Sequence, residues 1–261
     1  MTLEGAVVIV TGGNSGIGLH LTEALPAKGH RVAVADLDGG NVTPLGSNHP
    51  SQPLFVRCDV GDESAVGDAV EAVVSSWGRI DVLVNCAGVA RFATFDALSI
   101  DELRRQLDVN FLGYVRFIKA VLPHMRSQGK GFIKNLTSTV GIGGGSDLAG
   151  YASSKGAIDG LTRTLRLELE RHGIHVTLVY PPPTRTTATL PLGVPPVLLA
   201  DPKAVGQKLA AKLFSPRPVI TPGLRSALLW YSPRLFPVVS VKVLDRLTRL
   251  LRVVFPRSTT S

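Results

Sequence analysis

Apolar runs of strand length, separated by stretches with helical spacing, most constrain how this chain can fold. Six of them lie at residues 6–10, 31–36, 53–60, 80–88, 131–138 and 174–180. A further run at 217–223 is the expected last strand. Strands that are apolar on both faces are typical of a parallel sheet covered by helices on both sides. With right-handed crossovers, the chain is predicted to form an α/β, doubly wound parallel sheet.

Helices are expected between these runs, at residues 16–28, 62–77, 100–125, 151–171 and 201–214. Pro26 falls inside the first helix and should end or kink it. After Tyr180 the proline-rich stretch "PPPTRTTATLPLGVPP" is expected to form an extended flap.

We predict a single domain over residues 1–261 with three parts. Residues 1–185 would form the core, 186–223 a substrate flap and last strand, and 224–261 a basic C-terminal extension.

Composition limits the classes of protein that remain. With 44% hydrophobic and 18% charged residues, the 261-residue chain can bury a large core and is not extensively disordered. No basic segment precedes the first apolar run as in a signal peptide, and no uncharged apolar run reaches the ~18 residues that span a bilayer. The two cysteines, Cys58 and Cys86, lack further ligands at metal spacing. We therefore expect a cytoplasmic protein with no metal site.

Most of the net charge of +8 lies in the C-terminal extension, which shows no base-reading or stacking motif for nucleic acid. Apolar residues at helical spacing oppose basic ones there: Leu244, Leu247, Leu251 and Val254 against Lys242, Arg246, Arg249 and Arg252. Such a basic amphipathic helix can lie on an anionic bilayer as a peripheral contact. It can equally pack on the protein body or on a second subunit, and the sequence leaves these alternatives open.

The loop "TGGNSGIG", Thr11 to Gly18, joins the first strand to the first helix. Its glycines allow a tight turn that brings a pyrophosphate to the helix N-terminus, where free N–H groups favour anions. About twenty residues later, the second strand ends at Asp36. A carboxylate there can accept hydrogen bonds from both ribose hydroxyls and would repel a 2′-phosphate. This pair of features favours NAD over NADP.

These motifs, with others in the same order, resemble the short-chain dehydrogenase/reductase family over residues 3–190. The glycine loop matches its T-G-x-x-x-G-x-G element, "CDV" (58–60) its D-V element, and "NCAG" (85–88) its N-N-A-G element. Ser138, with Tyr151 and Lys155 in Y-x-x-x-K, matches its catalytic set, and Asn110 falls where the family has a catalytic asparagine. The resemblance implies a Rossmann-type fold, a nicotinamide cofactor, and a homodimer or homotetramer formed through the helices at 100–125 and 151–171.

The loop and the resemblance together predict the residues that bind the cofactor. These are Gly12, Asn14, Ser15, Gly16, Ile17, Gly18, Asp36, Asp59, Val60, Asn85, Ala87, Gly88, Tyr151, Lys155, Pro181, Thr184 and Thr186. Gly13, Asn14, Ser15 and Leu37 stand where NADP-preferring members commonly have Arg or Lys, so the predicted cofactor is NAD(H).

Tyr151 and Lys155 are four residues apart and share a helix face. A tyrosine with a pKa near ~10 is a poor base at neutral pH. A lysine ammonium and a positive nicotinamide ring would lower that pKa, so that Tyr151 could exchange a proton with an alcohol or ketone. The resemblance implies that Ser138 orients the substrate oxygen and Lys155 holds the nicotinamide ribose. It also implies that Asn110 positions a water linking Lys155 to solvent.

The sequence departs from the family after the sixth strand, where "YPPPTRT" has Pro182 in place of an expected glycine. This stretch is similar to "YPPDTDT" of the 3-ketodihydrosphingosine reductase-like branch, whose usual NADPH preference conflicts with Asp36. The following flap is rich in apolar residues: Leu190, Leu192, Val194, Val197, Leu198 and Leu199. Both features favour a lipophilic substrate.

The leading hypothesis is an NAD-dependent oxidoreductase that interconverts a secondary alcohol and a ketone on a sterol, terpenoid, lipid or polyketide-like molecule. One alternative is an NADPH- or NADH-dependent ketoreductase of a long-chain lipid or acyl substrate. Another is a non-catalytic nucleotide sensor with this fold, against which the intact Ser138, Tyr151 and Lys155 set counts.

Overall fold

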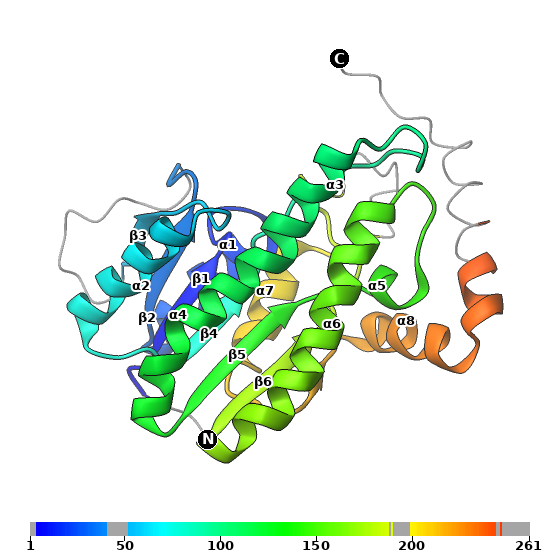
Figure 1. The fold of residues 1–261 in the computed structure, drawn as a ribbon. Helices are drawn as coiled ribbons and strands as arrows, with labels where there is room; N and C mark the ends of the chain where they lie inside the picture. Colours follow the sequence, from blue (N-terminus) through cyan, green and yellow to red (C-terminus); the bar gives the residue numbers. More distant parts are fainter. Residues whose placement is uncertain (1–3, 41–51, 188, 190–198, 244–245, 247–261) are drawn as a thin grey trace.

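A parallel seven-stranded sheet forms the centre of the computed structural model, which describes residues 4–40, 52–187, 189, 199–243 and 246 (Figure 1). Its strands are β1 (Val7–Thr11), β2 (Arg31–Asp36), β3 (Leu54–Arg57), β4 (Val82–Asn85), β5 (Gly131–Leu136), β6 (Ile174–Val179) and β7 (Val219–Ile220). They lie in the order β3-β2-β1-β4-β5-β6-β7. The order reverses between β1 and β4, as in a doubly wound sheet. The predicted fold class is confirmed.

Helices cover both faces because successive side chains of each strand point to opposite sides. Val8 and Val10 of β1 pack with α1 (Gly16–Ala24) and α7 (Pro202–Ala210). Val7 and Ile9 pack in the core that also holds α2 (Glu63–Trp77) and α4 (Gly113–Gln128). Further helices are α3 (Ile100–Leu107), α5 (Val140–Gly143), α6 (Ala149–Leu169) and α8 (Leu224–Leu235), with a helical segment at 237–243. Short 3₁₀ turns lie at Pro26–Lys28 and Glu170–His172, and a π-helical turn at Asp108–Leu112. Among the described residues, none of the helices is long and apolar enough to cross a membrane.

Several predicted strands are longer than the observed ones. The runs at 53–60, 80–88 and 131–138 leave the sheet after Arg57, Asn85 and Leu136. Their last residues form loops at the carboxyl ends of the strands. In such a sheet the carboxyl ends of the strands form the ligand crevice. The residues wrongly assigned to strands are therefore the loop residues that border this crevice.

The first helix ends as Pro26 predicts. α1 stops at Ala24, and Pro26 begins a 3₁₀ turn. The expected helix over 16–28 is therefore too long by its last turn, because a proline cannot donate the hydrogen bond that would continue it.

The helical stretch expected over 100–125 is present, but it is not one regular α-helix. The chain forms α3, a π-helical turn at Asp108–Leu112, and then α4. Two close contacts fall in this turn and just after it: the Asn110 side chain bonds the backbone of Val89, and a Cβ on Gly113 would lie 2.9 Å from a Val60 methyl. Such π-helical insertions are frequently found at functional sites.

Candidate active site

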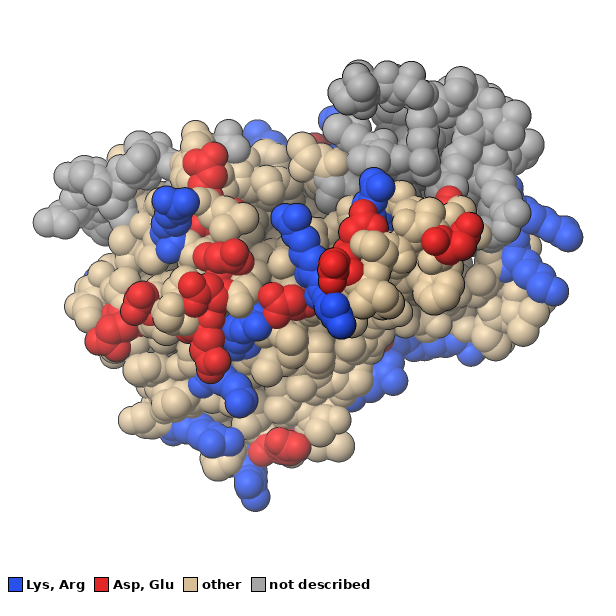
Figure 2. Space-filling model, turned by 45° about the horizontal axis from the view of Figure 1, so that its top comes forward, with Lys and Arg blue, Asp and Glu red and all other residues tan. Residues whose placement is uncertain are grey.

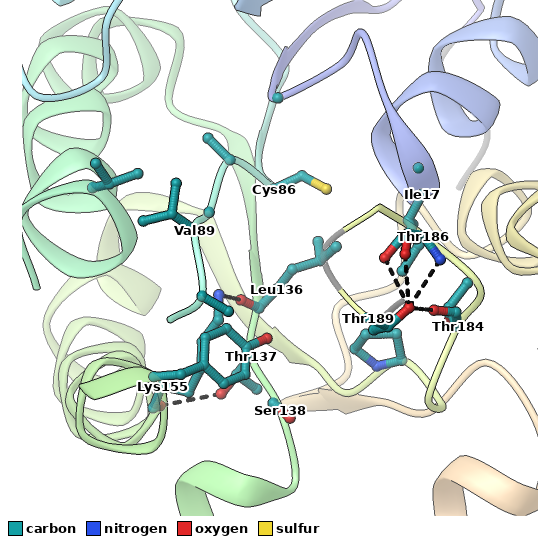
Figure 3. A pocket seen from close by; sticks show the side chains of 18 of the residues that line it. Ile17, Cys86, Val89, Leu136, Thr137, Ser138, Lys155, Thr184, Thr186 and Thr189 are labelled. Carbon is teal, nitrogen blue, oxygen red and sulfur yellow. Dashed lines mark hydrogen bonds between the residues drawn. The ribbon is translucent and has the colours of Figure 1, made fainter. Parts of the chain in front are cut away.

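A cavity of about 980 Å³ lies at the carboxyl ends of the strands (Figure 3). Most of the residues predicted for the site line it: Gly12, Ser15, Gly16, Ile17, Asp36, Asp59, Val60, Ala87, Gly88, Ser138, Tyr151, Lys155, Pro181, Thr184 and Thr186. Asn14, Gly18, Asn85 and Asn110 do not line it, although each belongs to a segment that does. The fold therefore gathers the predicted residues into one place.

Close backbone packing in the glycine loop excludes a side chain at Gly12 and at Gly18. Gly12 and Gly16 have φ of +65° and +52°, values that L-residues with a Cβ rarely adopt. A Cβ on Gly12 would lie 2.7 Å from the Ala87 backbone, and one on Gly18 would overlap the carbonyl oxygen of Gly12. The loop is thus pressed against the loop that follows β4.

Thr11 ties these two loops together. Its hydroxyl oxygen accepts hydrogen bonds from the N–H groups of Cys86 at 3.0 Å and Ala87 at 3.1 Å. Asn85 is fully buried, and its amide donates to Asn135 at 2.9 Å, which joins β4 to β5. Its contact with the cofactor stays a prediction.

Asp36 lies at the end of β2 and lines the cavity. One of its carboxylate oxygens accepts from the N–H of Asn14 at 2.9 Å and the other from the N–H of Leu37 at 2.8 Å. Each oxygen keeps a second lone pair, and the adjoining Leu37 carries no charge. The tight glycine turn at the N-terminus of α1 and this carboxylate fit a dinucleotide: helix N–H groups suit a pyrophosphate, and Asp36 suits a ribose.

Ser138, Tyr151 and Lys155 meet on one wall of the cavity. Lys155 Nζ lies 5.6 Å from the centre of the Tyr151 ring. Burial raises the pKa of Tyr151 to about 12, and a hydrogen bond with Ser138 acts in the opposite direction. Burial lowers the pKa of Lys155 to about 8.

The expectation that Lys155 would lower the pKa of Tyr151 is therefore not met by the chain alone. The ammonium lies against the ring and is directed elsewhere: it donates to the Leu136 carbonyl at 3.0 Å and to the Tyr114 hydroxyl at 3.3 Å (Figure 3 for Leu136). Desolvation of the phenol is the largest cause of its raised pKa.

Tyr114 is a residue of this site that sequence reasoning missed. Its side chain is 1% exposed, its hydroxyl donates to the Leu136 carbonyl at 3.1 Å, and Lys155 Nζ lies 5.1 Å from its ring centre. Tyr114 and the Leu136 carbonyl thus hold the ammonium of Lys155 between them. The sequence signal that could have identified Tyr114 was its position four residues after Asn110, which places both residues on the same face of a helix.

Asn110 uses its side chain to hold the loop after β4. Its amide nitrogen donates to the Val89 carbonyl at 2.8 Å and to the Ser154 hydroxyl at 3.0 Å, and its oxygen accepts from the Val89 N–H at 2.7 Å. The side chain is fully buried. The water-positioning role implied by the resemblance stays a prediction.

The chain after β6 packs against the glycine loop. Thr189 Oγ1 donates to the carbonyls of Thr184 at 2.5 Å and Thr186 at 3.0 Å (Figure 3). A Cβ on Gly16 would lie 3.0 Å from a Thr186 methyl. The proline run leads into a bridge between Thr184 and Ala200. Of the predicted apolar flap positions, Leu199 is buried, and the others lie outside the described residues.

No group of three or more His, Cys, Asp or Glu that could hold a metal occurs in the described ranges. Cys58 and Cys86 are both free thiols. Burial raises the pKa of Cys86 to about 11, so this cysteine beside the cavity is a neutral thiol at neutral pH.

Comparisons with known proteins place the chain in a family. The family described as short chain dehydrogenase matches residues 6–193. The chain is 40% identical over 179 residues to the short-chain reductase protein NovJ of Streptomyces niveus, covering 67% of this chain and 68% of that protein. It is 33% identical over 187 residues to a 3-alpha-(or 20-beta)-hydroxysteroid dehydrogenase of Mycobacterium bovis, covering 72% of each.

A solved structure supports the same assignment. The 3-ketoacyl-(acyl-carrier-protein) reductase of Brucella melitensis complexed with NADH superimposes with a TM-score of 0.76 at 27% identity, covering 86% of this chain and 100% of that one. The chain belongs to the short-chain dehydrogenase/reductase family of oxidoreductases, whose members act on CH–OH groups with nicotinamide cofactors.

Proposed function

We propose that this protein is an NAD(H)-dependent oxidoreductase that interconverts a secondary alcohol and a ketone on a lipophilic substrate. The observation that carries the proposal is the convergence of Ser138, Tyr151 and Lys155 on the same cavity as Asp36 and the glycine loop. A nucleotide sensor would need the loop and Asp36 but not the other three residues.

A bound nicotinamide cofactor would supply the hydride chemistry at the substrate carbon. Tyr151 exchanges the proton at the substrate oxygen, and Ser138 orients that oxygen by a hydrogen bond. Because burial raises the pKa of Tyr151, its protonated form dominates at neutral pH, and this form serves ketone reduction. Alcohol oxidation needs the phenolate and should therefore accelerate as the pH rises.

Asp36 supports NAD over NADP as the cofactor. Its carboxylate lines the cavity with no basic side chain at the neighbouring Leu37, and a 2′-phosphate beside a carboxylate would be repelled. The cofactor-binding and catalytic roles assigned from the sequence are part of this proposal.

An apolar cavity wall supports a lipophilic substrate. Beyond the predicted residues, the cavity is lined by Val89, Phe92, Val140, Leu148, Leu229 and Val241. Two of the similar proteins are named for a hydroxysteroid and for a 3-ketoacyl carrier substrate. The likeness to the 3-ketoacyl-(acyl-carrier-protein) reductase and the "YPPPTRT" stretch support reduction of a long-chain acyl ketone as the second candidate function.

We also propose that the protein acts in the cytoplasm as a homodimer or homotetramer without a nucleic-acid partner. The free cysteines accord with a reducing compartment. The predicted basic amphipathic helix that would touch a membrane, built on Leu244 to Val254, lies outside the described residues apart from Arg246.

The proposal is tested by incubating the protein with NAD⁺ and a panel of sterol, terpenoid and long-chain secondary alcohols while following the NADH absorbance band. Ketones with NADH or NADPH test the reverse direction. Turnover of lipophilic alcohols and ketones with NAD(H) supports the proposal. Faster turnover of 3-ketoacyl substrates with NADPH would favour the second candidate, and binding of NADH without turnover of any substrate would favour a sensor.

A further inference from the structure

An apolar face along residues 224–243 is left uncovered by the rest of the described chain. Thirteen large apolar side chains are exposed among the described residues. Eight of them belong to residues 224–243: Leu224, Leu228, Tyr231, Leu235, Phe236, Val238, Val239 and Val243. Leu224 and Leu228 are 87% and 69% exposed. The first four recur at i, i+4, i+7 and i+11 along α8, so they form one stripe, and helix resumes at 237–243. Contiguous exposed apolar patches mark interaction surfaces.

The opposite side of the same segment is fastened to the protein body. The Arg234 guanidinium lies 4.2 Å from the centre of the Trp230 ring and donates to the Tyr180 hydroxyl at 3.3 Å. That hydroxyl donates in turn to the buried carboxylate of Asp159. α8 thus lies at the edge of the molecule beside α5 (Figure 1). The residues of its apolar stripe are exposed.

The inner side of this segment reaches the candidate active site. Leu229 of α8 and Val241 both line the cavity, and a Cβ on Gly143 of α5 would lie 3.1 Å from a Val241 methyl. The uncovered face and the apolar cavity are therefore two sides of one helical segment.

The charge of this segment decides which partner suits it. Residues 224–243 include Arg225, Arg234 and Lys242 and no Asp or Glu, and both Lys242 and Arg246 are exposed. Lys and Arg side chains stand along the right-hand edge in Figure 2, whereas most Asp and Glu side chains lie toward the middle and left. An isologous contact between two copies would bring these like charges together, whereas anionic headgroups attract them.

We propose that the face at 224–243 docks on the surface of an anionic bilayer, with its apolar stripe entering the boundary between headgroups and acyl chains. Interfacial helices with one apolar and one basic side bind in this way, to a depth of about 5–10 Å. Resting on the proposed function, the docked cavity receives its lipophilic substrate from that bilayer past Leu229 and Val241. The docking itself does not depend on the reaction.

Vesicle co-sedimentation of the full chain, without cofactor or substrate, tests the docking. We expect binding to phosphatidylcholine vesicles that contain phosphatidylglycerol at low salt, and weaker binding to phosphatidylcholine alone or at high salt. The double variant Leu228→Glu, Leu235→Glu should lower the partition coefficient about tenfold or more. The matched control Phe95→Glu, Ser76→Glu adds the same two charges at exposed positions outside the helices expected between subunits, with Phe95 77% exposed, and should bind as the wild type does.

A second variant keeps the test decisive if the first does not fold, as judged by circular dichroism. Lys242→Glu, Arg246→Glu leaves the apolar stripe intact and should abolish the preference for anionic vesicles. The proposal is overturned if the wild type does not sediment with anionic vesicles at low salt, or if control and stripe variants lose binding equally. It is also overturned if the stripe variant converts an oligomer to monomers in sedimentation velocity while vesicle binding persists, because the face then belongs to a second copy. None of these outcomes bears on the oxidoreductase proposal, which is tested by turnover in solution.

Discussion

Burial and hydrogen bonding act in opposite directions on the charge of Lys155. Burial lowers its pKa to about 8, while the Leu136 carbonyl and the Tyr114 hydroxyl accept hydrogen bonds from its amine. Acceptors at these positions favour the ammonium form and so work against desolvation. The charge beside Tyr151 therefore depends on two groups that neither the cofactor nor the substrate supplies.

Tyr114→Phe removes one of these acceptors and keeps the ring. We expect the pKa of Lys155 to fall further, because the ammonium loses a hydrogen bond of about 1 kcal/mol. The limb of the pH profile of kcat that reports Lys155 should move to lower pH, with kcat at pH 8 reduced several-fold. Tyr231→Phe, the same change at an exposed position, should leave the profile unmoved. Identical pH profiles for Tyr114→Phe and the wild type would show that the hydroxyl has no part in holding Lys155.

Asp36→Asn tests the choice of cofactor. The substitution keeps an oxygen for the hydrogen bond from Asn14 but removes the negative charge that would repel a 2′-phosphate. We expect the ratio of kcat/KM for NADH over NADPH to fall about tenfold or more, equivalent to about 1.4 kcal/mol. An unchanged ratio would show that the preference is set by another residue.

At the scale of the elements, buried polar groups connect strands and helices that are distant in sequence. Asp159 of α6 receives hydrogen bonds from Thr137, after β5, and from Tyr180, after β6. Arg234 extends this network to α8. Lys134 of β5 likewise donates to Thr177 of β6 at 3.0 Å and to the Ser215 carbonyl at 2.6 Å.

Arg234→Met should release α8 from the protein body. The cation lies 3.8 Å from the Asp159 carboxylate and stacks on Trp230. We expect a loss of about 1–2 kcal/mol in the free energy of unfolding in urea, together with faster proteolysis within residues 224–243. Arg163→Met removes a more exposed guanidinium that lies 3.4 Å from the same carboxylate, and its effect should be small. Equal effects of the two variants would contradict a specific role for Arg234.

Lys134 should make stability depend on pH. Burial lowers its pKa from 10.5 to about 7. Between these values the unfolded chain binds a proton that the native protein does not, so the free energy of unfolding rises as pH increases from about 7 toward 10. Lys134→Met should reduce that rise, as measured by urea denaturation at pH 7 and pH 9.5. A variant with the same pH dependence as the wild type would show that Lys134 is charged in the native state.

At the scale of the whole molecule, periodicity and strand-end motifs predicted the sheet, and most of the residues predicted for the site line one cavity. What they missed depends on contacts between distant segments. The π-helical turn at Asn110 inserts into a helix whose apolar spacing continues on both sides, so it leaves little trace in the pattern. The contact between Tyr114 and Lys155 joins α4 to α6.

Burial was the second property that the sequence did not reveal. The spacing of Tyr151 and Lys155 shows that they share a helix face, but the pKa of Tyr151 is set by the walls that desolvate it. Apolar residues such as Leu228 and Leu235 are normally expected to be covered, and only the fold shows that the described residues leave them exposed. The predicted three-part division of the chain stays a prediction.

Tyr151→Phe tests the central claim most directly, because it removes one oxygen atom and retains the ring. NADH binding, followed by cofactor fluorescence, should stay within about twofold of wild type, while turnover of a lipophilic alcohol should fall by at least about 10²-fold. Normal turnover in this variant, measured on protein that still binds NADH, would contradict the assignment of Tyr151 as the residue that exchanges the substrate proton.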